Sequence, residues 1–152
     1  RNAIGDAVFE VYYTPEDFVT AKRTISSVTN NWNNTSLIFS AEIAGEKIMY
    51  LGDSQEIPNN LTAAVFGSYL KSDICQVAHH GGIGGTETIY KQIDPEIALF
   101  TTTAVLVPVY NQKFSYNNYL INQLHVKEYW NAADRIKTFM LPYHATGSGF
   151  VK

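Results

Sequence analysis

Residues 74–82 read ICQVAHHGG, an apolar run that ends in two histidines and two glycines. A short apolar run of this kind is typical of a buried strand, and paired histidines at its end are uncommon by chance. Glycines continue at positions 84 and 85, so we expect an open, mobile loop beside a site. This stretch predicts a buried strand that presents functional side chains at its carboxyl end.

A second apolar run has the same form. Residues 47–53 read KIMYLGD, so an acidic side chain follows the run, and Gly52 leaves room for a ligand or a neighbouring backbone. Asp53 alone favours a turn or a cap, but functional groups gather at the carboxyl ends of strands in a sheet with helical crossovers. We therefore expect Asp53 and one of the two histidines to lie within about 8 Å of each other and to share a metal.

Hydrophobic periodicity along the rest of the chain alternates between strand-like and helix-like segments. The expected strands are 7–13, 35–44, 47–52, 73–78, 97–102 and 137–141, and the expected helices are 57–70, 86–93 and 115–125. Residues 44–46 are the expected turn of a hairpin, and Ser115 is the expected cap of the last helix. This order implies α/β architecture, with helices packed on a sheet face.

Composition limits the class of protein. The 152 residues suit one domain. Fourteen acidic side chains against 11 basic ones give a net charge of −3, which provides no general attraction for nucleic acid. No run approaches the roughly 18 apolar residues of a membrane span. The lone Cys75 lies in an apolar run and is expected to be a buried thiol, and the compartment stays open between the cytoplasm and the bacterial cell surface or medium.

Six landmarks fall in order between residues 5 and 102. They are Asn33–Leu37, Gly45–Ile48, Leu51–Asp53, Leu70–Ile74, His79–Gly81 and Ile93–Ala98. Together they resemble the metallo-β-lactamase-like domains attached to bacterial competence proteins and the stand-alone relatives of those domains. The resemblance implies that residues 1–152 are the C-terminal half of an αββα sandwich, with a mixed sheet and helices on one of its faces.

The resemblance also implies roles for three side chains. In that family the aspartate of the Gly-Asp motif bridges two metals and a histidine of the His-His-Gly motif completes one of the sites, so Asp53 and His80 are the expected zinc ligands. His79 is the expected catalytic residue, which contacts a phosphate or donates a proton to the leaving group. Because side chains alternate along a strand, only one of the two histidines is expected to face a metal.

One part of the family pattern is missing. These enzymes take most of their metal ligands from a His-x-His-x-Asp-His motif and a further histidine in the N-terminal half of the fold, and this chain has neither. A zinc site needs about three or four protein ligands, so Asp53 and His80 alone should hold metal poorly and the chain as given should be inactive. His125 is expected to be a partly exposed helix residue, and His144 to lie away from the site.

A half-sandwich also predicts an uncovered sheet face. Leu37 with Phe39, and Ile48 with Tyr50, are the expected same-face pairs, and a large apolar patch is rarely tolerated on a soluble monomer. We expect the missing N-terminal half, a second copy of the chain or the tail around Phe150 to cover this face.

For the complete protein the resemblance implies hydrolysis by a metal-activated water, with two zinc ions. Phosphodiesters are the leading substrate class, ahead of lactones and β-lactams. The alternative is a non-catalytic binding module that keeps the metallo-β-lactamase fold. A His-x-His-x-Asp-His motif encoded upstream of Arg1 would favour the enzyme, and any other sequence there would favour the binding module.

Overall fold

The computed structural model describes residues 2–20 and 31–151. Within these ranges eight strands form one sheet whose spatial order follows the chain, from β1 to β8. They are β1 Asn2–Ile4, β2 Ala7–Tyr13, β3 Ile38–Ile43, β4 Glu46–Tyr50, β5 Ile74–Gln76, β6 Ile97–Phe100, β7 Glu128–Asn131 and β8 Gly149–Val151. Neighbours from β1 to β4 pair antiparallel and those from β4 to β8 pair parallel, so the sheet is mixed, as expected.

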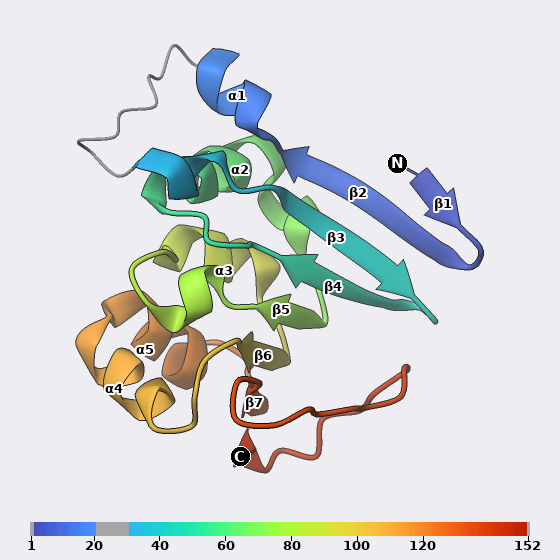
Figure 1. Ribbon diagram of the computed structural model, residues 1–152. Helices are drawn as coiled ribbons and strands as arrows, with labels where there is room; N and C mark the ends of the chain where they lie inside the picture. The colour runs from blue at the N-terminus through green and yellow to red at the C-terminus, as the bar shows by residue number, and fades with distance from the viewer. Residues whose placement is uncertain (1, 21–30, 152) are drawn as a thin grey trace.

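The larger helices share one face of this sheet. The α-helices are α1 Pro15–Thr20, α2 Glu56–Phe66, α3 Glu87–Ile93, α4 Leu106–Lys113 and α5 Ser115–Gln123, and the 3-10 turns are η1 Asn31–Thr35, η2 Gly67–Leu70 and η3 Ala78–Gly81. Figure 1 shows α3, α4 and α5 on one side of the sheet, and apolar side chains of α2 to α5 join the strands in one core. The α/β class expected from the sequence is confirmed.

Local chemistry sets several of these boundaries. Ala44 and Gly45 both have positive φ, 54° and 82°, which is the backbone that a tight hairpin between twisted strands requires. The hydroxyl of Thr86 accepts a hydrogen bond from Ile89 N and caps α3, and Asp94 ends that helix in the left-handed conformation. The expected strand 7–13, the hairpin and the helix at 86–93 are therefore confirmed, with shorter hairpin strands than expected.

The C-terminal third differs most from expectation. Residues 137–141 are not a strand of the sheet, the sequence did not predict α4, β7 or β8, and α5 begins at Ser115 without a side-chain cap. Exposure alternates along residues 137–145, which bend at Leu141 and Pro142, and alternate side chains pack on the sheet face opposite the helices. The alternation that suggested a strand is real, but the segment lies across the sheet instead of pairing with it.

The face opposite the helices is only partly covered. Ile48, Ile74 and Ile97 are buried there under a tail cluster that consists of Phe139, Leu141, Tyr143 and Ala145. Phe150 does not take part, because it stacks on Tyr129 and packs against the helix-side core. Toward the antiparallel edge Ile4, Val11 and Leu37 remain 74%, 50% and 44% exposed. The tail therefore covers the centre of this face through other residues than expected.

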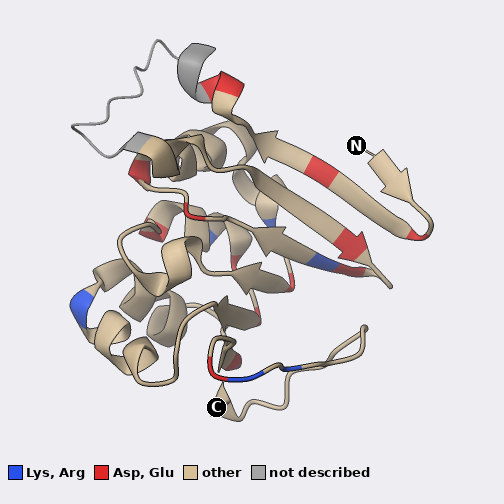
Figure 2. Cartoon of the chain, in the orientation of Figure 1, with Lys and Arg blue, Asp and Glu red and all other residues tan. Residues whose placement is uncertain are grey.

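The distribution of charged residues and the lengths of the described helices are in line with the small net charge and the lack of long apolar runs in the sequence. Figure 2 shows acidic and basic residues interspersed over the coloured part of the cartoon, without a basic strip along any described element. In the described ranges, no helix has the length and apolar character that crossing a membrane requires. Cys75 is fully buried, as expected, and burial raises the pKa of its thiol.

Candidate functional site

Three loops meet at one edge of the sheet. Because β4, β5 and β6 run parallel, their carboxyl ends lie side by side. Asp53 follows β4, the two histidines follow β5, and Thr101 follows β6 directly. The strand order therefore brings these four side chains to a common edge.

Asp53 and His80 face each other at this edge. The distance from Asp53 Oδ1 to His80 Nε2 is 3.4 Å, which confirms the expected proximity. The two side chains are 43% and 52% exposed, so the pair is open to solvent and to ligands.

The histidine pair lies in a turn and not at the end of a strand. β5 stops at Gln76, and His79 and His80 both adopt left-handed backbone in η3, with φ of 49° and 60°. Strand alternation therefore does not separate the two rings, whose centroids are 5.9 Å apart, and that part of the expectation is wrong. Left-handed backbone at a non-glycine residue costs on the order of 1–3 kcal/mol and is concentrated at functional sites.

Each imidazole is anchored through its Nδ1 atom. Nδ1 of His79 lies 2.5 Å from the carbonyl oxygen of Ile83. Nδ1 of His80 lies 3.1 Å from the carbonyl oxygen of Thr101 and 2.8 Å from its hydroxyl. A carbonyl oxygen only accepts, so both carbonyl contacts are hydrogen bonds only when Nδ1 carries the proton, and Nε2 then has the lone pair of the neutral ring.

A buried amide joins the first two loops. Gln76 is 9% exposed, and its Oε1 accepts hydrogen bonds from Leu51 N at 3.1 Å and Gly52 N at 2.8 Å. In return, Gly52 O accepts from His79 N at 2.9 Å. Gln76 therefore fixes Asp53 relative to the histidines. Sequence reasoning missed it, although a lone amide within an apolar strand is a usable signal.

The glycines after the histidines serve close packing. A Cβ at Gly84 would lie 2.6 Å from His79 Cβ and 2.9 Å from Ser54 O, and one at Gly85 would collide with the Tyr90 ring. Asn59 Nδ2 also donates to Gly84 O at 2.8 Å and ties the loop to α2. The expectation of an open loop is wrong for these two buried positions.

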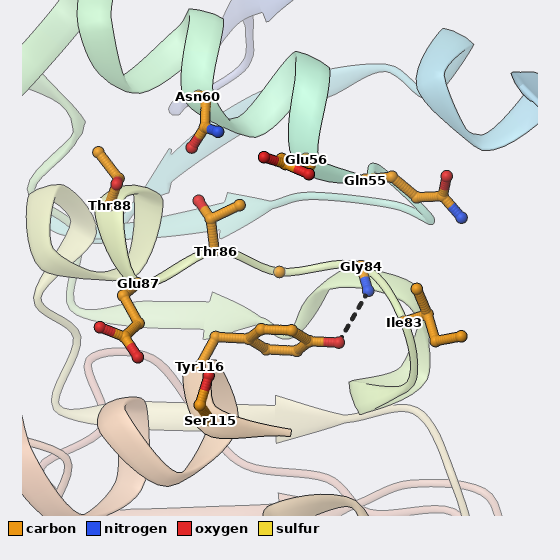
Figure 3. A pocket seen from close by; sticks show the side chains of 11 residues that line it. Gln55, Glu56, Asn60, Ile83, Gly84, Thr86, Glu87, Thr88, Ser115 and Tyr116 are labelled. Atoms are coloured by element: carbon orange, nitrogen blue, oxygen red, sulfur yellow. Dashed lines mark hydrogen bonds between the residues drawn. The ribbon is translucent and has the colours of Figure 1, made fainter. Parts of the chain in front are cut away.

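A pocket of about 430 Å³ lies beside this loop. Gln55, Glu56, Asn60, Ile83, Gly84, Gly85, Thr86, Glu87, Thr88, Ser115 and Tyr116 line it. Figure 3 shows Glu56 above the loop backbone from Ile83 to Thr86, and Glu87 and Tyr116 below it. None of the described lining residues is Lys or Arg. Carboxylates, hydroxyls and amides suit a ligand group that donates hydrogen bonds.

The remaining histidines lie elsewhere. His125 follows the end of α5, so its expected place within a helix is wrong, and its Nδ1 lies 2.9 Å from Asp94 Oδ1. His144 lines a different pocket with Ala44, Asp73 and Glu96, which precede the parallel strands and so mark the opposite edge of the sheet. His144 therefore lies away from the site, as expected.

The donor set at the edge is small. Within residues 2–20 and 31–151, no group of three or more His, Cys, Asp or Glu side chains is placed to hold a metal ion. Asp53 and His80 supply two donor atoms, which is fewer than the three or four of a usual zinc site.

Comparison with known proteins does not assign a family. The chain matches no protein-family model and no curated protein.

Proposed function

We propose that this chain belongs to a metal-dependent hydrolase of the metallo-β-lactamase type, in which Asp53 and His80 are metal ligands and His79 is catalytic. One observation carries the proposal, the 3.4 Å between Asp53 Oδ1 and His80 Nε2. Donors about 2.1 Å from a tetrahedral zinc ion are roughly 3.4 Å from each other, so the pair has the spacing of one edge of a zinc tetrahedron.

Hydrogen bonding supports a cation between the two groups. Nδ1 of His80 donates to Thr101, so a neutral His80 turns the lone pair of Nε2 toward the carboxylate of Asp53. Two electron-rich atoms repel each other at this distance. A proton or a metal ion between them removes the repulsion, and metal-ligating histidines usually donate their other N–H to an oxygen in this way.

The two donors fit part of a zinc site, so we infer that the remaining ligands come from outside the described residues. A zinc ion supplies, when bound, a water whose pKa is near 7. His79 is the group of this chain that meets the substrate: its Nδ1 is occupied by Ile83 O, and its Nε2 exchanges a proton with the leaving oxygen or contacts a phosphate.

A phosphodiester is the substrate class that we propose. His79 and the cation between Asp53 and His80 suit the phosphoryl oxygens. The pocket beside the glycine loop suits the attached alcohol, because hydroxyl groups can donate to Glu56 or Glu87 and no described lining residue is Lys or Arg. A small phosphoester would therefore span the strand-end edge and the pocket.

Zinc titration of the chain tests the ligand assignment. We expect weak binding that Asp53→Asn and His80→Ala each abolish, because each removes one of two donors. His125→Ala is the matched control, since His125 pairs with Asp94 and lies outside the site. Equal zinc affinity in all four proteins would refute the assignment.

A binding module without catalysis is the second candidate. It is favoured by the small donor set, which within the described residues falls short of three ligands. The sequence encoded upstream of Arg1 separates the two candidates: a His-x-His-x-Asp-His motif supports the hydrolase, and its absence from the full protein supports the binding module.

A further inference from the structure

We infer that the main-chain carbonyl of Thr101 and the side chain of Tyr116 are positioning groups, which hold His80 and His79 respectively in the tautomer with the proton on Nδ1. The use of the free Nε2 atoms rests on the proposed function, but the tautomers themselves do not. Two separate anchoring arrangements converge on these adjacent histidines.

The first anchor is direct. Thr101 presents both its carbonyl and its hydroxyl oxygen to Nδ1 of His80, at 3.1 and 2.8 Å. Its place is set by the sheet, because Phe100 immediately before it is fully buried and pairs with Asn131 in β7. A residue fixed by β6 therefore orients a ring that belongs to the loop after β5.

The second anchor acts through the glycine loop. The Tyr116 hydroxyl donates to Gly82 O at 2.8 Å and accepts from Gly84 N at 3.3 Å. These two glycines flank Ile83, whose carbonyl accepts the proton of His79 Nδ1. Burial raises the pKa of the Tyr116 phenol, which keeps it protonated as a donor. Tyr116 thus holds the acceptor of His79 without a hydrogen bond to His79 itself.

Anchoring matters because both rings are accessible and both residues have left-handed backbone. An unanchored neutral imidazole samples both tautomers, and the one with the proton on Nε2 cannot bind a metal through that atom. Partners that fix a ligating histidine are typically worth about 10- to 100-fold in metal affinity.

Long-range ¹H–¹⁵N NMR of the ¹⁵N-histidine-labelled chain, at a pH where the rings are neutral, reads each tautomer directly. We expect the Nδ1–H form for both histidines. Thr101→Val removes the hydroxyl but keeps the carbonyl oxygen, so His80 should retain the Nδ1–H form in this variant. Tyr116→Phe removes both phenol hydrogen bonds and should affect His79 only.

Thr101→Val is the control for Tyr116→Phe. The inference fails if either wild-type ring carries its proton on Nε2, if Thr101→Val converts His80 to the Nε2–H form, if Tyr116→Phe leaves His79 unchanged, or if Tyr116→Phe disturbs both rings alike. A general loosening of the fold would give that last pattern, and backbone spectra would identify it.

Zinc added to the same samples separates the inference from the proposed function. We expect zinc to shift His80 Nε2 in the wild-type chain, in Thr101→Val and in Tyr116→Phe, because all three keep the carbonyl that holds His80. If the tautomers respond as expected but zinc shifts no histidine in the wild-type chain, the positioning roles stand and the metal assignment fails.

Discussion

His79 and His80 are adjacent in the chain, yet different parts of the fold hold their rings. The loop after β6 anchors His80, and a loop clamped by α5 anchors His79. Of the two, His80 is the one whose ring lies 3.4 Å from the carboxylate of Asp53 within the described residues. The two residues are therefore expected to differ in function although their backbone conformations are alike.

In the full-length protein, we predict that His80→Ala lowers the metal content, because it removes a donor beside Asp53. His79→Ala should keep the metal and lower turnover by about 10²- to 10⁴-fold, the usual contribution of a general acid or base. Metal analysis and hydrolysis of a chromogenic phosphodiester measure the two effects. The opposite pattern would mean that the two histidines exchange roles.

Gln76 accepts hydrogen bonds from the backbone that leads to Asp53. We predict that Gln76→Leu lowers the free energy of unfolding by about 1–3 kcal/mol. The substitution removes the amide oxygen that accepts hydrogen bonds from the backbone N–H groups of Leu51 and Gly52. These N–H groups are buried and half-buried, so they are then left without an acceptor. Urea unfolding measures the change. Gln92→Leu, the same substitution on the partly exposed side of α3, should change stability by less than about 0.5 kcal/mol.

At the scale of elements, a buried carboxylate fastens the tail to the sheet. Glu128 in β7 is fully buried and accepts hydrogen bonds from Trp130 Nε1 and Tyr143 Oη, both at 3.0 Å. Thr146 donates to it through both N and Oγ1. Burial opposes ionisation of this carboxyl group, but the hydrogen bonds outweigh it and lower the pKa to about 2.

We predict that attachment of the tail depends on pH in the acid range. A carboxyl group with a lowered pKa stabilises the fold fully above its unfolded pKa of about 4.3, and this contribution is lost as the pH falls toward 2. Fluorescence of Trp130, which contacts Phe139 and Tyr143, should follow the loss. Glu128→Gln should remove this transition and weaken the tail at neutral pH, whereas Glu96→Gln at an exposed ion pair should do neither. A transition that survives in Glu128→Gln would contradict the assignment.

Elements with local signals could be predicted, and those set by distant contacts could not. Thr86, Asp94 and the Ala44–Gly45 turn mark boundaries through their own backbone chemistry. By contrast, β7 contains Glu128 and Trp130, which are buried or half-buried only because the tail returns to cover them. A covering tail is among the expectations from the sequence, but around Phe150, and no local signal marks Phe139 and Tyr143 as the residues that return.

The same distinction holds within the site. Asp53 and His80 could be placed together because parallel strands bring their carboxyl ends to one edge. Thr101 and Tyr116 could not be found, because neither follows a recognisable motif and both reach the histidines across loops. The rings themselves were misplaced because β5 stops at Gln76 and η3 begins at Ala78, still within the apolar run, so that both histidines lie in the turn.

At the scale of the whole molecule, the sheet face opposite the helices is covered unevenly. The tail buries its centre, but Ile4 and Val11 lie on the same face of β1 and β2 and are 74% and 50% exposed. Val11 is paired with Phe39, which stacks on Tyr50 at the border of the tail cluster. An apolar strip thus continues from the covered centre to the open antiparallel edge.

We predict that the isolated chain self-associates through this strip at high concentration, because burial of exposed apolar surface is worth about 25 cal/mol per Å². Sedimentation equilibrium should show a concentration-dependent mass, and Ile4→Ser with Val11→Ser should return the chain to a monomer. Val105→Ser is the matched control, since Val105 is 78% exposed just before α4, away from this face.

A monomer at all concentrations would mean that the tail alone covers enough of this sheet face and that the sheet does not require a second layer. Association that survives the double substitution would place the contact elsewhere. Association that the double substitution abolishes would identify this strip as the contact surface between copies of the chain.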